Sequence, residues 1–177
     1  MPARCSRVRR SSSRAPSTFP EGALTLEEEL PEFERYAQAG FTEIDYVLNQ
    51  RAVDERDFDA IEHEMRGVAE FCRAHGMRDK VIVEMPKLES EADKRRVCEI
   101  ALKARPAFLK TSSGRPYQAT LDDVRLMAEV LGDKVQVKAA GGIRTYEQAK
   151  AFIEAGASAL GATAGIAIVE GERAAGA

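Results

Sequence analysis

The sequence predicts an α/β protein in which parallel strands alternate with helices, as in a (β/α)8 barrel. Two observations favour this fold class. A strand pattern, a loop and a helix with a capping sequence follow one another five times along the chain, and this repeat is typical of parallel βαβ units. Two short apolar runs each carry one lysine, Lys110 and Lys138, and they lie 28 positions apart, about one strand–helix unit of a barrel.

The first element after the N-terminal segment is a helix that begins at Thr25. The threonine hydroxyl and the Glu28 carboxylate form a capping box, because each can satisfy a free backbone N–H at a helix start. Pro31 is expected to kink this helix, since proline cannot donate the hydrogen bond that the interior requires. Gly40 is expected to end it.

Residues 43–49 are predicted to form the first strand. Their side chains alternate, with Glu43, Asp45 and Asn49 on one face and apolar residues on the other. In a barrel the apolar face contacts the helices, so the polar face is predicted to point into the lumen.

A long helix is predicted over residues 54–75, where apolar residues recur at helical spacing up to Gly76. Residues 80–85 follow as a strand. By the same alternation Glu84 points into the lumen, where we expect it to pair with a lumen lysine rather than to catalyse.

The pattern then repeats with little change. Helices that open with a hydroxyl residue at the cap are predicted over residues 90–104, 120–131 and 145–155. The strands between them carry Lys110 and Lys138, and a last strand over residues 157–162 leads into a short final helix near Gly165.

The two predicted strands that carry Lys110 and Lys138 indicate a reactive lysine amine. Lys110 lies in FLKTSSG (residues 108–114), and Lys138 lies in VQVKAAGGIR (residues 135–144). Adjacent strands are roughly 4.8 Å apart, so two inward lysines at similar height repel each other and one is expected to lose its proton. Lowering a lysine pKa from ~10.4 to near 7 requires about 4 kcal/mol, which a like charge and desolvation can supply. A lone strand lysine usually reaches water, but two in register favour an amine nucleophile.

Composition restricts the classes of function. The chain has 177 residues, of which 44% are hydrophobic and 31% charged, with a net charge of −3, as in one ordinary globular domain. No apolar run approaches the ~18 residues that span a bilayer, so we expect a soluble, cytoplasmic protein without a membrane partner. Residues 1–20 hold five arginines and no acid, so the remainder carries about −8, which argues against nucleic acid as a partner.

Four stretches together resemble the deoxyribose-phosphate aldolases, which are class I aldolases built as (β/α)8 barrels. They are FLKTSSG, VKAAGGIRT, EIDYVLN and ALGATAGIAIVEG, and they occur in the family's order and spacing from about Phe19 to Gly171. The resemblance implies a lyase of deoxyribonucleotide catabolism. It would cleave the sugar phosphate 2-deoxy-D-ribose 5-phosphate to D-glyceraldehyde 3-phosphate and acetaldehyde through a lysine Schiff base.

The resemblance also implies roles for three residues. Lys110 matches the lysine that forms the Schiff base. Lys138 matches the second lysine, a proton relay whose charge lowers the pKa of the imine-forming amine. Asp45 matches the lumen aspartate that donates and accepts protons together with a water.

Phosphate binding is expected in the last two strand-to-helix loops, where barrel phosphate sites usually lie. Glycine turns that lead into helix starts present several backbone N–H donors to one anion, although a glycine pair alone more often marks a tight turn. The candidates are Gly141, Gly142, Gly161, Thr163 and Ala164. Relatives usually have two hydroxyl residues where this chain has Thr163 and Ala164, so one phosphate ligand is replaced. Met85 stands where a threonine is often found.

Metal chemistry and other cofactors are not expected. Cys5, Cys72 and Cys98 are far apart and odd in number, which indicates reduced thiols. His63 and His75 fall in one predicted helix and are expected at the surface. A zinc-dependent aldolase needs convergent histidines, so the composition favours Schiff-base chemistry.

The expected organisation has three parts. Residues 1–18 are a basic Ser/Arg-rich tail, disordered or the product of a misplaced start, although their composition is also that of an organelle transit peptide. Residues 19–171 form a partial barrel, and residues 172–177 a C-terminal tail. Because FPEG (residues 19–22) resembles the end of the family's third strand, about the first two to three strand–helix units, roughly 70 residues, are expected to be absent.

Two other readings of the sequence stay open. The chain can be a truncated, catalytically silent relative that serves as a fragment or interaction module. It can also be a related barrel aldolase that acts on another sugar phosphate. The sequence does not determine whether it forms a homo-oligomer.

Overall fold

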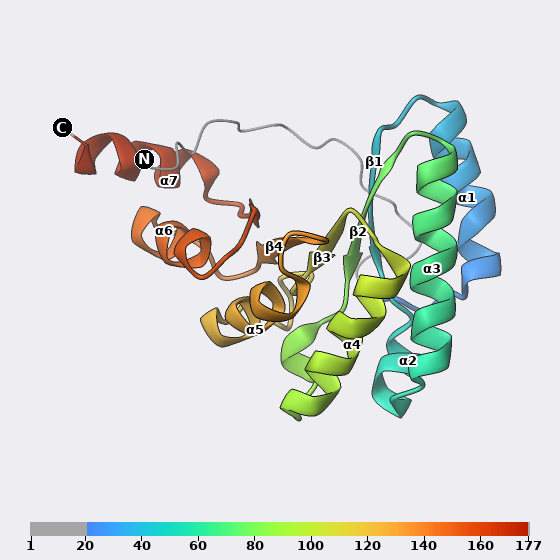
Figure 1. Cartoon of the computed structure of the whole chain (residues 1–177). Coiled ribbons are helices and arrows are strands. Elements are labelled where there is room, and N and C mark those ends of the chain that lie inside the picture. Colours follow the sequence, from blue (N-terminus) through green and yellow to red (C-terminus); the bar gives the residue numbers. More distant parts are fainter. Residues whose placement is uncertain (1–20, 177) are drawn as a thin grey trace.

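A curved sheet of five parallel strands forms the centre of the computed structural model, which describes residues 21–176 (Figure 1). Each strand pairs with the next one along the chain, in the order β1-β2-β3-β4-β5. The strands are β1 (Glu43–Val47), β2 (Arg78–Ile82), β3 (Phe108–Lys110), β4 (Gln136–Ala140) and β5 (Ala159–Gly161). The predicted partial barrel of five strand–helix units is confirmed. The predicted tail over residues 1–18, together with Cys5, lies outside the described residues.

Helices connect the strands and cover one face of the sheet, and Figure 1 shows α3, α4 and α5 side by side along it. Serine and threonine begin three of them as predicted: the hydroxyls of Ser90, Thr120 and Thr145 accept hydrogen bonds from the backbone three residues on. The helices are α1 (Leu26–Gln38), α2 (Gln50–Glu55), α3 (Phe58–Ala74), the short 3-10 helix η1 (Met85–Lys87), α4 (Glu91–Ala104), α5 (Leu121–Leu131), α6 (Tyr146–Glu154) and α7 (Gly165–Ala175).

The long helix predicted over residues 54–75 is confirmed as α3 from Phe58 to Ala74, but its first two residues belong to a separate helix, α2. Arg56 ends α2 in the left-handed conformation, with a φ of 56°. The side chain of Asp57 then accepts a hydrogen bond from the N–H of Ala60 and begins α3. Apolar spacing alone did not reveal this break, since the apolar residues of both helices face the same core.

Asn49 was expected on the lumen face of the first strand, and this prediction is also wrong. β1 ends at Val47, and the Asn49 side chain accepts hydrogen bonds from the N–H groups of Arg51 and Ala52 at the start of α2. An asparagine that directly precedes a helix favours this capping position over a strand.

α1 ends just before Gly40, as predicted, whereas α7 ends later than expected. α1 continues through Pro31 to Gln38. α7 extends to Ala175, so residues 172–175 are helical and not a tail. Within residues 21–176, no helix is long and apolar enough to cross a membrane.

The core lies between the sheet and the helices. From β1, Ile44 and Tyr46 point into it, as the alternation predicts, and Val81 and Leu109 continue it on the next two strands. Each of these side chains is at most 2% exposed, and full burial of a side chain of this size contributes ~1.5–3 kcal/mol. The opposite, inner face of the sheet is therefore the face left for polar side chains.

Candidate active site

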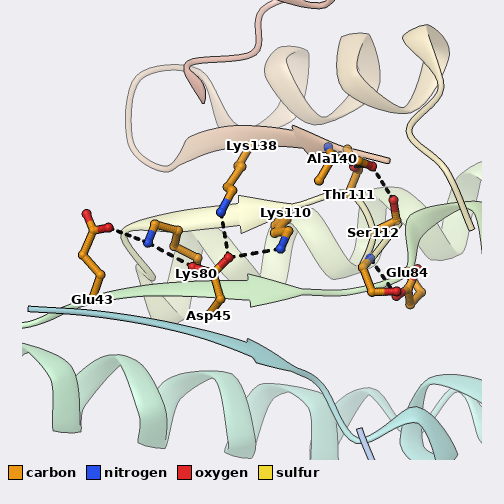
Figure 2. A network of polar contacts seen from close by, with 10 residues as sticks. Glu43, Asp45, Lys80, Glu84, Lys110, Thr111, Ser112, Lys138 and Ala140 are labelled. Carbon is orange, nitrogen blue, oxygen red and sulfur yellow. Dashed lines mark hydrogen bonds and ion pairs between the residues drawn. The ribbon is translucent and has the colours of Figure 1, made fainter. Parts of the chain in front are cut away.

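Four charged side chains from four neighbouring strands meet on the inner face of the sheet (Figure 2). Lys110 on β3 lies directly opposite Lys138 on β4, so the predicted adjacency of the two lysines is confirmed. Asp45 on β1 lies opposite Lys80 on β2. Parallel strands in register bring these groups together although they are far apart in the sequence.

The Asp45 carboxylate is the centre of this group. Its Oδ2 accepts hydrogen bonds from the Nζ of Lys138 at 2.7 Å and from the Nζ of Lys110 at 3.0 Å. Its Oδ1 accepts one from the Nζ of Lys80 at 3.0 Å. Both oxygens therefore contact ammonium groups, and Figure 2 shows the three lysines converging on them.

Charge and burial act in opposite directions on Asp45. Burial alone would raise the pKa of this carboxyl, but the charges of Lys110, Lys138 and Lys80 outweigh it and hold the pKa well below its ordinary value. Asp45 is therefore ionised at neutral pH, where it acts as a fixed negative acceptor for the lysines.

Lys138 binds its proton less tightly than an ordinary lysine. Burial lowers its pKa most, the charge of Lys110 lowers it further, and Asp45 partly opposes both effects. This agrees with the expectation that one of the two paired lumen lysines holds its proton less tightly, although the resemblance gave that role to Lys110. At a given pH, a larger fraction of a lysine with a lowered pKa is neutral and available to accept a proton.

The hydroxyl residues after Lys110 bind the end of the neighbouring strand. The Oγ of Ser112 donates a hydrogen bond of 2.6 Å to the carbonyl of Ala140, and the Oγ1 of Thr111 accepts one of 3.1 Å from the N–H of Ala140. These contacts continue the pairing of β3 and β4 beyond Lys110 (Figure 2). They hold the two lysine strands at a constant separation.

Glu84, expected to pair with a lumen lysine, contacts the loop that follows β3. Its Oε1 accepts a hydrogen bond of 2.8 Å from the N–H of Ser113. Burial raises the pKa of this carboxyl. Its second oxygen has no hydrogen-bond partner within the part of the chain that the structure describes. Glu84 thus stabilises the loop beside Lys110.

Backbone conformation and close packing in the loop after β4 explain why two glycines stand there. Gly141 and Gly142 have φ values of 94° and 78°, which side chains rarely adopt. A Cβ atom on Gly141 would lie 2.9 Å from the Cα of Gly114, so this glycine lets the loops after β3 and β4 approach each other.

The other phosphate candidates lie at the end of β5. A Cβ on Gly161 would meet the Cβ of Ala140 at 2.9 Å, next to the Lys138 stem. Ala164 precedes α7 and has no side-chain cap, while Thr163 is exposed. The five candidates thus lie at or just after the carboxyl ends of two adjacent strands, β4 and β5.

A cavity of about 310 Å³ adjoins the glycine pair. It lies against α5 and α6, and none of the three lysines lines it. Its lining residues are Gln118, Ala119, Leu121, Gly141, Gly142, Gln148, Ala151 and Phe152. The structure therefore separates this cavity from the charged group on the inner face.

Comparisons with known proteins agree with this arrangement. No family model matches the chain. The deoxyribose-phosphate aldolase of Thermococcus gammatolerans is 43% identical over 156 residues, which are 88% of this chain and 69% of that protein. The chain belongs to the deoxyribose-phosphate aldolase family. The enzyme of that name from Caldanaerobacter subterraneus is 45% identical over 154 residues, 86% of this chain and 66% of the relative.

Solved structures of deoxyribose-phosphate aldolases and a related aldolase share the fold. One titled "QR15, an Aldolase" has a TM-score of 0.77 and 35% identity, and the match covers 86% of this chain and 68% of that one. The tetrameric deoxyribose phosphate aldolase of Aeropyrum pernix has a TM-score of 0.80 and 26% identity, with 89% and 66% covered. The chain thus spans about two thirds of the length of these relatives.

Lys80 is the residue of the aldolase site that sequence reasoning missed. The alternation predicted for residues 80–85, which assigned Glu84 to the inner face, also assigns Lys80 to it, four positions earlier. This signal was present, but a strand-end lysine is usually read as exposed. Its side chain is only 7% exposed.

The two histidines and the two cysteines among residues 21–176 lie away from the aldolase site. His63 and His75 are at the surface, as predicted, beside Glu27 and Glu34. Cys72 and Cys98 are buried free thiols, and burial raises the pKa of each to about 12. Residues 21–176 contain no cluster of three or more histidine, cysteine, aspartate or glutamate side chains suited to a metal ion.

Proposed function

We propose that this chain is a class I aldolase that cleaves 2-deoxy-D-ribose 5-phosphate to D-glyceraldehyde 3-phosphate and acetaldehyde. One observation carries the proposal: Lys110 and Lys138, in register on adjacent strands, share the Oδ2 of Asp45. Membership of the aldolase family supports the substrate. The setting that fits is nucleotide catabolism in the cytoplasm.

Lys110 is the proposed nucleophile. Its side chain is 8% exposed, so little water competes for the amine. The neutral amine attacks the C1 aldehyde of the open-chain sugar, and the resulting carbinolamine loses water to give an iminium ion. The iminium then accepts the electron pair of the C2–C3 bond as that bond breaks, which gives an enamine and the aldehyde of glyceraldehyde 3-phosphate.

Asp45 and Lys138 are the proposed proton-transfer groups. A proton must leave the C3 hydroxyl during cleavage, and one must reach C2 of the enamine before water releases acetaldehyde. Lys138 is suited to exchange protons because its pKa is lowered. Asp45 contacts both lysine amines and can relay a proton between them through a water.

The phosphate is proposed to bind at the loops after β4 and β5, through Gly141, Gly142, Gly161, Thr163 and Ala164. The N–H groups at the start of α7 support this, since Ala164 offers no side-chain cap that would occupy them. We further propose a homo-oligomer, on the precedent of the tetrameric relative from Aeropyrum pernix.

Reductive trapping tests this proposal. Borohydride added with acetaldehyde should attach one ethyl group to the wild-type chain, and peptide mapping should place it on Lys110. Lys110→Met should prevent the addition, because methionine keeps the bulk of the stem and lacks the amine. Lys94→Met on α4 is the control and should trap normally. Equal trapping in the Lys110→Met variant would show that another lysine is the nucleophile.

A catalytically silent relative is the second candidate function. It is favoured by the length of the match, which covers only about two thirds of the relatives. Turnover of 2-deoxy-D-ribose 5-phosphate, measured on the same preparation as the trapping, separates the two candidates. A chain that traps acetaldehyde but releases no glyceraldehyde 3-phosphate would support the second.

A further inference from the structure

Lys80 lies between two carboxylates on the inner face of the sheet. Its Nζ donates to the Oε2 of Glu43 at 2.9 Å and to the Oδ1 of Asp45 at 3.0 Å. Both acceptors come from β1, two positions apart on the same face, and Lys80 reaches them from β2. The side chain is 7% exposed. A buried ammonium group held by two carboxylates has little freedom to leave its place.

The contact with Lys80 determines how Asp45 faces the other lysines. Because Lys80 occupies Oδ1, the carboxylate presents Oδ2 to both Lys110 and Lys138. Rotation of the carboxylate would exchange the two oxygens and would require the Lys80 hydrogen bond to break. Lys80 therefore restricts the orientation of a group that contacts both lysines of the proposed reaction.

Glu43 in turn holds Lys80 in place, and it also lies next to a second group of charged and polar contacts, centred on Arg78. The guanidinium of Arg78 lies 3.8 Å from Glu43, stacks 4.8 Å above the centre of the Phe108 ring, and donates to Gln136 at 2.9 Å. These contacts join four strands below the site. Glu43 thus connects Lys80 to contacts across four strands that involve none of the proposed catalytic groups.

We propose that Lys80 and Glu43 are positioning residues: Lys80 holds Asp45 so that its Oδ2 contacts Lys110 and Lys138 together, and Glu43 anchors Lys80. This inference rests on the proposed aldolase function. Neither residue touches the reacting atoms. Their loss should disturb the proton transfers that use Asp45 and leave the formation of the imine at Lys110 largely intact.

The two steps can be measured separately with acetaldehyde. Borohydride trapping reports imine formation. In D₂O, the enzyme-bound imine loses a methyl proton to give the enamine and regains a deuteron from solvent, so exchange of the methyl protons reports proton transfer. Both measurements use the full chain and need no phosphorylated substrate.

For Lys80→Met, trapping at Lys110 should stay within about twofold of wild type. The rate of proton exchange should fall about tenfold or more. A positioned acid–base group contributes roughly 100-fold or more to a rate, and a residue that only positions such a group is expected to contribute less. The acid limb of the exchange rate should also move to higher pH, because Asp45 without this positive neighbour keeps its proton to higher pH. Lys80→Arg keeps the charge and should leave the acid limb in place.

Lys94→Met is the matched control. Lys94 forms another largely buried ion pair, with Asp123 between α4 and α5 on the outer side of the sheet. Its loss should lower the melting temperature without changing the exchange profile. If Lys80→Met fails to fold, the double variant Lys80→Met/Glu43→Gln removes the charges together and should show the same loss of exchange and the same shift.

Wild-type exchange with an unshifted acid limb in a folded Lys80 variant would overturn the inference and leave the aldolase proposal standing. Absence of trapping in the wild-type chain would instead overturn the aldolase proposal, and this inference with it. The two failures are therefore distinguishable.

Discussion

At the scale of single residues, one aspartate organises the proposed chemistry. Three lysines converge on Asp45, and one of them, Lys80, also contacts the carboxylate of Glu43. Such a buried group is stable only while its charges remain paired, since an isolated buried charge costs several kcal/mol. Each member should therefore affect both the stability and the pH dependence of the chain.

Replacement of Lys138 tests the coupling between the two lysines in register. In Lys138→Leu the positive charge opposite Lys110 is lost, and with it the like-charge repulsion that disfavours two protonated amines in register. Aldol cleavage should therefore fall most at neutral pH and recover in part at alkaline pH. The measurement is a pH–rate profile of cleavage. A profile that is lowered uniformly, with its acid limb in place, would indicate a structural or substrate-binding role for Lys138.

At the scale of elements, α1 packs against α3 and carries an uncommon buried acid. Glu29 on α1 is 0% exposed, and neither carboxylate oxygen has a hydrogen-bond partner within residues 21–176. Burial raises its pKa to about 9, and the charges of Glu64 and Glu32 contribute. Glu64 on α3 is also buried, and burial raises its pKa to about 8, although it accepts hydrogen bonds from the N–H of Asn49.

These buried acids predict a loss of stability at alkaline pH. A carboxyl with a raised pKa binds its proton more tightly in the folded state than in the unfolded state. Its contribution to the free energy of unfolding is therefore complete below about pH 4.5, the ordinary pKa of a glutamate. That contribution decreases as pH rises through about 8 to 9, by up to ~1.4 kcal/mol per pH unit for each group. Glu29→Gln removes one such group, so its free energy of unfolding should fall less between pH 7 and 9.

Denaturant unfolding at several pH values measures this effect. Glu70→Gln, which changes an exposed acid of α3, is the control and should follow the wild-type curve. Identical pH dependence in Glu29→Gln and the wild type would mean that Glu29 is ionised in the folded chain.

At the scale of the whole molecule, the sheet has two ends. β1 and β5 each pair with only one strand among residues 21–176, whereas β2, β3 and β4 pair on both sides. An unpaired strand edge offers backbone donors and acceptors to other chains. The charged inner face adds a polar surface that a closed barrel would enclose.

The 177-residue chain expressed alone should therefore associate through the edge of β1 or be poorly soluble, and its turnover should be low. Fusion of the N-terminal strand–helix units of a longer relative should give a compact, active protein, because those units would cover this edge. Analytical ultracentrifugation and cleavage assays on both proteins check this. A monomeric, cooperatively melting 177-residue chain with turnover equal to that of the fusion would contradict it.

Much of the fold followed from the sequence alone, because its signals are local. Hydroxyl residues at helix starts and the alternation of apolar residues along strands depend on neighbours a few positions away. They correctly predicted four of the helix starts and the order of the five strands, although β1 and β2 end at Val47 and Ile82, before the predicted ends. The spacing between Lys110 and Lys138 likewise predicted their adjacency, since one strand–helix unit separates neighbouring strands.

The tertiary structure alone decided that three lysines share one carboxylate. Asp45 and Lys138 are 93 positions apart and come from strands that do not pair with each other, so no local pattern relates them. Lys80 joins them because the register of β1 and β2 places it opposite Asp45. Register and sheet curvature arise from the packing of the whole core against the helices, and this packing, not any short stretch of sequence, brings three lysines to one carboxylate.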